Sequence, residues 1–99
     1  MHYVTVTYPN QNATKFDFDY YMKKHIPMVA GLLKTTIEVS KGVANPTGQP
    51  VANLCVARIR INSVDEFSAM MAKHGAQIMG DIVNYTNIQP AVQIDEVLN

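Results

Sequence analysis

The stretch Phe16–Met28 holds the side chains of this chain that are most capable of chemistry. It contains two aspartates, two tyrosines, a histidine and a proline. Apolar side chains recur from Phe18 onward at spacings of three and four residues, which predicts an amphipathic helix. His25 falls on the apolar face of that helix. An imidazole there can act as a general acid or base near neutral pH, or it can be a core side chain satisfied by a backbone or tyrosine hydrogen bond.

The neighbours of His25 divide into chemical and structural candidates. Tyr21 lies one helical turn earlier, so the two side chains can share a face. Its phenol could orient the imidazole or bind a substrate carbonyl, or the ring could simply pack in the core. Asp17 and Asp19 lie where helix N-termini attract acids, and we expect Asp17 to cap the helix. Pro27 lacks a backbone donor, which predicts a kink or a restart of the helix.

Further candidates come from the second half of the chain. His74 lies on the apolar stripe of a second predicted helix and could face the same cleft as His25. Two histidines without a carboxylate cluster make a poor metal site, so we expect no metal. Tyr85 and Asn87 lie at the entry to the last predicted strand. They could bind substrate at the rim of the cleft, or they could serve the turn.

Four segments alternate apolar and polar residues with the period of a strand. These predicted strands are Tyr3–Tyr8, Thr35–Ser40, Asn53–Ile61 and Thr86–Val97. One helix follows Asp17, and another follows Ser63, which forms a capping box with Glu66. A long loop, Gly42–Asn53, joins the second and third strands. Pro90 cannot donate to a sheet, which makes the last strand an edge strand or one with a bulge.

The order β-α-β-β-α-β predicts an α+β fold of the ferredoxin-like type, with a four-stranded antiparallel sheet. Strands one and three should be central, and both helices should cover one face. The other face is mixed in character, so either solvent or a partner could cover it. It carries Thr5, Thr7, Glu38, Arg58, Arg60 and Gln93.

Composition narrows the class of protein. The 99 residues predict one domain spanning 1–99. The 8 basic and 8 acidic residues give a formal net charge of +0, and no basic run points to nucleic acid or an anionic membrane. The apolar runs are too short to cross a bilayer. Cys55 has no partner for an internal disulfide, and the start lacks a signal-peptide pattern, so we expect a cytoplasmic protein.

Three segments resemble the EthD family, named for a protein associated with ethyl tert-butyl ether degradation. The first two are Phe16–Tyr21 and His25–Val29, in the first helix. The third is Asp81–Pro90, which is similar to the family's motif near the end of the domain. Together with the opening strand and the spacing between the motifs, the resemblance covers nearly the whole chain.

The resemblance implies a homodimeric α+β barrel, in which two sheets pack against each other with the helices outside. Sites in such barrels lie in the cleft between the helices and the sheet of each protomer. His25 and Tyr21 match motif positions, and the resemblance therefore implies that they are the catalytic pair. Asn87, Tyr85 and His74 are the candidates for contact with substrate.

Two functions follow as hypotheses. The first is a cofactor-independent enzyme, of oxygenase, isomerase or cyclase type, that acts on a small hydrophobic or aromatic compound. The alternative is a non-catalytic dimer that binds an apolar ligand or assists a degradation pathway. Haem binding through His25 or His74 is a third option, but we expect no cofactor.

Overall fold

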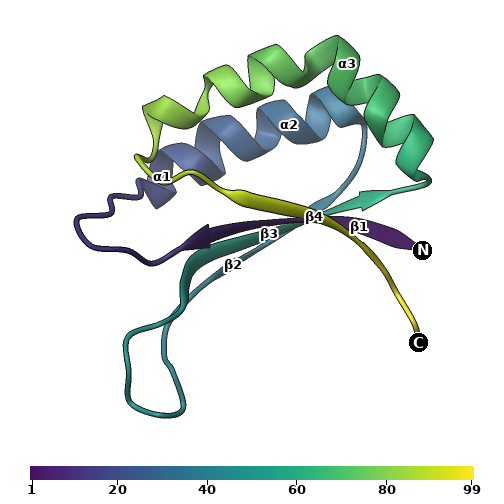
Figure 1. Cartoon of the computed structure of the whole chain (residues 1–99). Helices are drawn as coiled ribbons and strands as arrows, with labels where there is room; N and C mark the ends of the chain where they lie inside the picture. Colours follow the sequence, from purple (N-terminus) through teal and green to yellow (C-terminus); the bar gives the residue numbers. More distant parts are fainter.

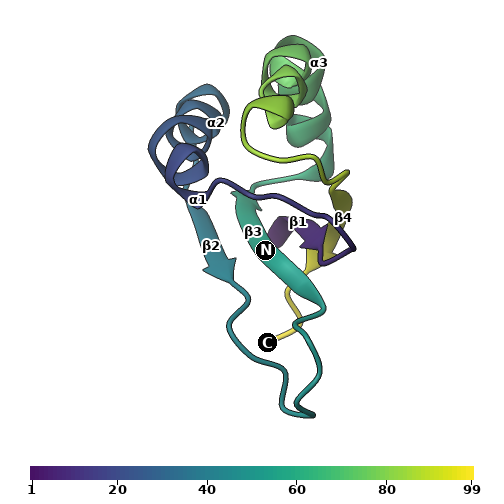
Figure 2. The same cartoon turned by 90° about the vertical axis from the view of Figure 1, so that its left-hand side faces the viewer.

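The computed structural model describes residues 1–99 and has the predicted ferredoxin-like architecture. Four antiparallel strands form one sheet in the order β2-β3-β1-β4, so the first and third strands are central, as expected. Both helical segments lie on one face of this sheet (Figure 1, Figure 2). The strands are β1 (His2–Pro9), β2 (Ile37–Lys41), β3 (Asn53–Ile61) and β4 (Ala91–Glu96).

The first helical segment has three parts. It begins with α1 (Phe18–Tyr20), where the Asp17 side chain accepts a hydrogen bond from the Tyr20 amide at 3.0 Å and so caps the helix as predicted. A π-helical turn over Tyr21–His25 follows, and then α2 (Ile26–Leu33). Pro27 lies in the first turn of α2, where a missing N–H is tolerated. Of the kink or restart predicted at Pro27, the structure shows a change from π-helical to α-helical bonding at Ile26, with the backbone helical on both sides.

The second helical segment is α3 (Val64–Gly80), which starts at Ser63. The Ser63 hydroxyl accepts a hydrogen bond from the Glu66 amide at 3.1 Å, which is half of the predicted capping box. The Glu66 carboxylate instead accepts hydrogen bonds from the Asn62 side chain. A 3-10 turn, Ile82–Asn84, follows α3.

The last strand is shorter than predicted. It begins at Ala91 rather than at Thr86. The amides of Tyr85 and Thr86 both bond to the Ile82 carbonyl at 3.1 Å, which holds this segment in a turn. Pro90 then offers no donor to a neighbouring strand. Ile88 continues the apolar alternation of the strand, but it is buried in an irregular segment before the strand begins.

The core lies between the helices and the inner face of the sheet. Only 12 of the 99 residues are buried, so the interior is thin. No helix lies on the opposite face of the sheet (Figure 2). Two clusters make up the apolar interior. One contains Val4, Val29, Ile59 and Ile78, and the other contains Tyr8, Tyr21, Cys55, Ala57, Tyr85 and Ile88.

The outer face of the sheet is mixed in character, as expected from the sequence. Arg58 lies 4.5 Å above the centre of the Tyr3 ring and 4.0 Å from the Glu38 carboxylate. Thr5 donates a hydrogen bond to Asp95. The loop between β2 and β3 and the C-terminus both extend away on the side opposite the helices (Figure 1, Figure 2). Neither of the helical segments has the length and apolar character needed to cross a membrane.

The Ser63 cap gives a test of this fold. Replacing Ser63 by Ala leaves the Glu66 amide without its side-chain acceptor and should lower the free energy of unfolding by about 1 kcal/mol. Urea denaturation measures this loss. The control is Ser68→Ala on an exposed position inside α3, which should be neutral or slightly stabilising because alanine favours helices. Equal effects of the two substitutions would contradict the assigned start of α3.

Candidate functional site

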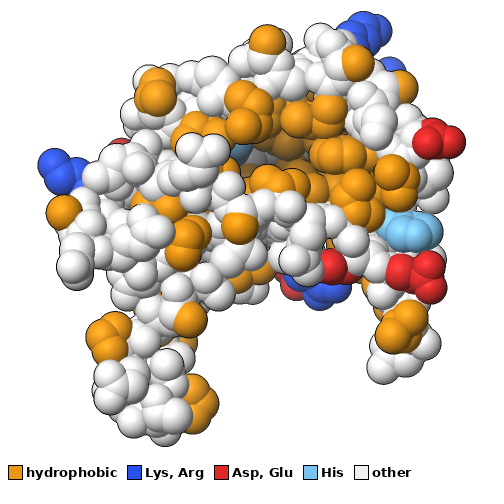
Figure 3. All heavy atoms as spheres, in the orientation of Figure 1, with side chains coloured by type: hydrophobic (Ala, Val, Ile, Leu, Met, Phe, Trp, Pro, Cys, Tyr) orange, Lys and Arg blue, Asp and Glu red, His pale blue; other side chains and the backbone are white.

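A cavity of about 80 Å³ lies between the helices and the inner face of the sheet. Of its 19 lining residues, 17 are hydrophobic, and the other two are His25 and Pro90. Figure 3 shows this hollow between the helices and the sheet, surrounded by hydrophobic side chains. A larger hollow of about 280 Å³, around Lys34 and Arg60, contains no histidine or tyrosine. Of these two, the smaller cavity is the one that contains an imidazole in an apolar wall.

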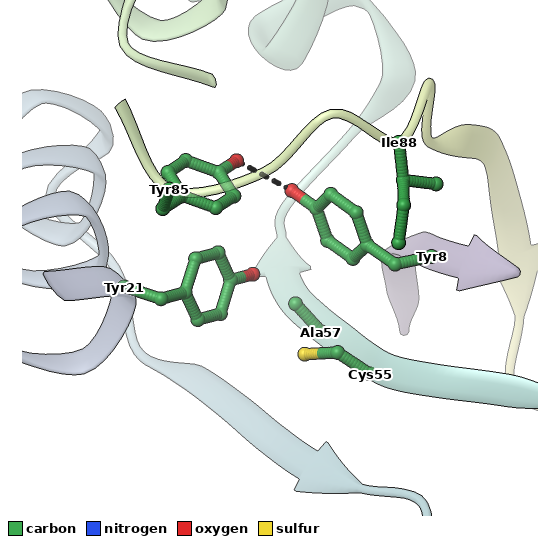
Figure 4. Close-up of a cluster of buried hydrophobic side chains, with 6 residues drawn as sticks. All are labelled: Tyr8, Tyr21, Cys55, Ala57, Tyr85 and Ile88. Carbon is green, nitrogen blue, oxygen red and sulfur yellow. Dashed lines mark hydrogen bonds between the residues drawn. The ribbon is translucent and has the colours of Figure 1, made fainter. Parts of the chain in front are cut away.

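A chain of polar atoms runs along one end of the cavity. The Tyr8 and Tyr85 hydroxyls lie 2.7 Å apart, and Figure 4 draws the hydrogen bond between them. The Tyr85 hydroxyl lies 3.4 Å from His25 Nε2. All three side chains line the cavity, and each is almost completely buried. A bound molecule would therefore meet a ring nitrogen and a hydroxyl within an otherwise apolar wall.

The other nitrogen of His25 is held by an acid. His25 Nδ1 lies 2.9 Å from Asp81 Oδ2. The second oxygen of Asp81 accepts hydrogen bonds from the Tyr20 hydroxyl at 2.7 Å and from the Asn84 amide at 2.9 Å. Asp81 is 16% exposed, whereas the His25 side chain is 5% exposed. The network thus runs from the surface of the protein to its interior.

Burial sets the protonation of His25. Desolvation lowers the pKa of His25 below its usual 6.5, although the hydrogen bond and the charge of Asp81 partly oppose this. Desolvation alone would raise the pKa of Asp81, but the hydrogen bonds from Asn84, Tyr20 and His25 together hold it below 3.8. At neutral pH the pair is therefore a neutral imidazole beside a carboxylate, and His25 can accept a proton.

The tyrosines and the cysteine stay protonated. Desolvation raises the pKa of Tyr85 and of Tyr21 far above the usual 10.0. Their hydroxyls can donate hydrogen bonds but do not ionise. Cys55 is fully buried, as expected of a small core side chain, and burial raises its pKa to about 11. A thiol that is protonated and shielded from solvent is a poor nucleophile.

The π-helical turn places Tyr21 against His25. Their rings are nearly parallel, with an interplanar angle of 16° and centroids 5.4 Å apart. Tyr21 also contacts Tyr8 and Tyr85, edge-on and tilted respectively. Figure 4 shows the Tyr21 ring pointing from the first helical segment toward the strand that carries Cys55. Tyr21 thus forms a wall of the site and supports the imidazole.

The structure brings together some of the residues singled out from the sequence and separates others. His25, Tyr21 and Tyr85 line the cavity. Asn87 does not line it. Its side chain accepts a hydrogen bond from the Lys15 amide at 2.9 Å and donates one to the Ala13 carbonyl at 3.0 Å. His74 is half-buried on α3 and is not among the cavity residues either.

Sequence reasoning did not single out Asp81, Tyr8 and Tyr20 as members of the site. Asp81 lies inside the motif Asp81–Pro90, but its partner His25 is 56 residues away. Tyr8 shares its strand face with Val4 and Val6, a pattern that could have placed it toward the helices. No group of three or more His, Cys, Asp or Glu side chains is arranged to hold a metal ion.

Comparison with solved structures identifies similar proteins. The chain matches an EthD-like protein from Ralstonia eutropha JMP134 with a TM-score of 0.91 and 38% identity, over 99% of this chain and 92% of that one. It also matches an ethyl tert-butyl ether (EthD) family protein from Bacillus halodurans C-125 with a TM-score of 0.79 and 16% identity, over 99% of both chains. The second likeness shows the fold alone. Neither a family model nor a curated protein matches the chain.

The buried imidazole predicts how stability depends on pH. Because the pKa of His25 is lower in the folded state, the unfolded chain binds this proton more readily below pH 6.5. The contribution of neutral, buried His25 to the free energy of unfolding is fully present above the pKa of the unfolded state. It decreases as the pH falls toward the pKa of the folded state. The depressed pKa of Asp81 acts in the same direction below 3.8. Urea denaturation should therefore give a smaller free energy of unfolding at about pH 5.5 than at about pH 7.5.

The control for this prediction is a comparison of two histidine variants. His25→Gln should flatten the pH dependence between these two values, whatever its effect on absolute stability. His74→Gln should keep the slope of the parent protein. An unchanged slope in His25→Gln would show that this imidazole does not titrate as its burial requires.

Proposed function

The chain belongs to the EthD-like family, and on that premise we propose that it is a cofactor-independent enzyme in which His25 takes a proton from a small hydrophobic or aromatic compound. The single observation that carries the proposal is the pair of polar atoms at one end of the cavity. There His25 Nε2 and the Tyr85 hydroxyl lie 3.4 Å apart, in a wall that is otherwise apolar. A neutral imidazole in such a place is suited to general base catalysis.

The proposed step moves one proton and leaves one electron pair. The substrate C–H or O–H bond breaks, the proton goes to Nε2, and the electron pair remains on the substrate as an enolate or phenolate. The Tyr85 hydroxyl, which lies 2.7 Å from the Tyr8 hydroxyl, donates a hydrogen bond to the developing oxyanion. Tyr21 keeps the imidazole ring in place by stacking on it.

This chemistry favours carbonyl compounds and phenols over ethers. An ether oxygen can accept a hydrogen bond from Tyr85, but an ether has no proton that an imidazole can remove near neutral pH. An enolisable ketone or a phenol has one. Isomerases, cyclases and cofactor-independent oxygenases can all begin by forming such an anion, so the first step fits each of these reaction types.

The size of the cavity sets a further condition. A cavity of roughly 150 Å³ holds benzene, whereas this one measures about 80 Å³. Met71 and Met79 both line it, and methionine side chains adapt readily to a ligand. We infer that these two side chains move when a substrate enters.

A second candidate function is ligand binding without turnover. The observation that favours it is that no buried side-chain nitrogen or oxygen lacks a hydrogen-bond partner. The Tyr8–Tyr85–His25–Asp81 network is thus complete without any substrate. In this alternative His25 and Tyr85 would only orient an apolar molecule that carries one polar group.

We also propose that the protein is a homodimer formed through the outer face of the sheet. No element of the chain covers that face, and a single protomer buries few residues. The face carries both signs of charge, including Arg58 and Glu38, which could pair between two copies. Val56 lies there opposite Thr7 on β1 and Ser40 on β2 and provides an apolar centre.

Deuterium exchange tests the proposed proton abstraction. The protein is incubated in D₂O with acetophenone, 1-indanone and 2-tetralone, and NMR follows the loss of the hydrogens next to the carbonyl group. The parent protein should exchange at least one ketone faster than buffer does. His25→Gln should lose about 100- to 10,000-fold of the enhancement because the base is gone. His74→Gln, which removes a histidine outside the cavity, should keep it.

Two results would count against the proposal. One is exchange that persists in His25→Gln. The other is the absence of exchange with every ketone. A ligand that also copurifies with the protein and stays unchanged on long incubation in mass spectrometry would then support the ligand-binding alternative.

Light scattering tests the dimer. The parent protein should have a mass of about 22 kDa, twice the 11.0 kDa of one chain. Val56→Lys should shift the population toward monomer, because a charge without a partner is costly in a buried interface. The matched control is Gln77→Lys on the exposed side of α3, which should stay dimeric. A parent protein that is monomeric at micromolar concentration would contradict this prediction.

A further inference from the structure

We propose that Asp81, held in place by Tyr20 and Asn84, is a positioning residue that fixes His25 in the tautomer with its proton on Nδ1. This inference rests on the proposed function in one respect: it explains how Nε2 stays free to take a proton. The tautomer itself can be measured without any substrate.

The side chains of Asp81 and His25 are in direct contact. Asp81 Oδ2 lies 2.9 Å from His25 Nδ1. An ionised carboxylate can only accept hydrogen bonds, so Nδ1 must carry the proton. In a neutral imidazole Nε2 then has the lone pair, and this atom is the one near the Tyr85 hydroxyl in the cavity.

The carboxylate of Asp81 cannot turn freely. Asp81 Oδ1 accepts two hydrogen bonds, from the Tyr20 hydroxyl at 2.7 Å and from the Asn84 amide at 2.9 Å. Tyr20 belongs to the first helical segment, whereas Asn84 belongs to the 3-10 turn after α3. Donors from two separate elements thus fix the plane of the carboxylate.

Asp81 lies at the C-terminal end of α3. It is the C-cap residue of α3, and its amide bonds to the Ile78 and Met79 carbonyls. The partial negative charge of a helix C-terminus disfavours an acid, and cations are preferred there. An aspartate at this position costs stability unless its side chain has strong partners, and three donors from His25, Tyr20 and Asn84 supply them.

The arrangement leads to a definite expectation for Asp81→Asn. The donors Tyr20 and Asn84 require an acceptor, so the new amide oxygen should take the place of Oδ1. The amide nitrogen then faces His25 Nδ1, which must accept a hydrogen bond. The imidazole proton therefore moves to Nε2, where it points at the Tyr85 hydroxyl, and the base is blocked.

The experiment is NMR on protein labelled with ¹⁵N-histidine at about pH 8, where the imidazole is neutral. Two-bond ¹H–¹⁵N correlations report which ring nitrogen carries the proton. His25→Gln identifies the signals of His25, and His2 and His74 serve as internal references. The parent protein should show the proton on Nδ1, and Asp81→Asn should show it shifted to Nε2.

A rescue variant separates positioning from a merely structural role. In Asp81→Asn combined with Tyr20→Phe and Asn84→Ala, no donor constrains the amide. Its oxygen can turn toward Nδ1, and the proton on Nδ1 should return. In the exchange assay, Asp81→Asn should lose about 100-fold or more of the enhancement, and the triple variant should regain part of it.

The outcomes distinguish the two proposals. A parent protein with the proton on Nε2, or in a mixture, overturns the inference even if no variant folds. An Asp81→Asn protein that keeps the proton on Nδ1 overturns it as well. Absence of ketone exchange with the expected tautomers in place overturns the proposed base catalysis and leaves the positioning by Asp81 standing.

Discussion

The hydrogen bond between His25 and Asp81 is the interaction on which the rest of the site depends. A histidine that is 4% exposed needs a partner for each ring nitrogen, and the two partners come from distant parts of the chain. Asp81 follows α3, and Tyr85 follows the next turn. The bond therefore ties the first helical segment to the end of the second at one end of the cavity.

Local patterns in the sequence were sufficient for the fold but not for the site. Alternation and helix caps predicted the element order, and the four-residue spacing of Tyr21 and His25 placed both on one face. Nothing local indicated Asp81 as a partner, because that contact spans 56 residues. Ile88 extended the apolar alternation into the irregular segment before β4, so the last strand was predicted to start too early. Asn87 looked available for a ligand, but its side chain makes hydrogen bonds to backbone groups of the loop that have no partner in a strand or helix.

The same side chains form the interior and the candidate site. Tyr8, Tyr21 and Tyr85 pack as aromatic groups against each other, and their ring edges and faces fill space that leucine or isoleucine would otherwise fill. Their hydroxyls bring polar atoms into that space, each of which needs a partner. In a thin core this means that a change of reactivity at the cavity is also a change of stability, and the two effects require separate measurements.

The π-helical turn has a consequence for comparing this chain with its relatives. It contains one residue more than an α-helix needs for the same advance, and such insertions are rare. Losing that residue would let the helix continue regularly with the flanking turns in register, so only the side chains of the turn itself would change direction. The geometry in which Tyr21 stacks on His25 within this turn would change with it. A single gap in an alignment across this turn therefore divides the family into two groups. Relatives that lack the extra residue can share the fold and every neighbouring residue type, yet lack the geometry of the Tyr21–His25 pair.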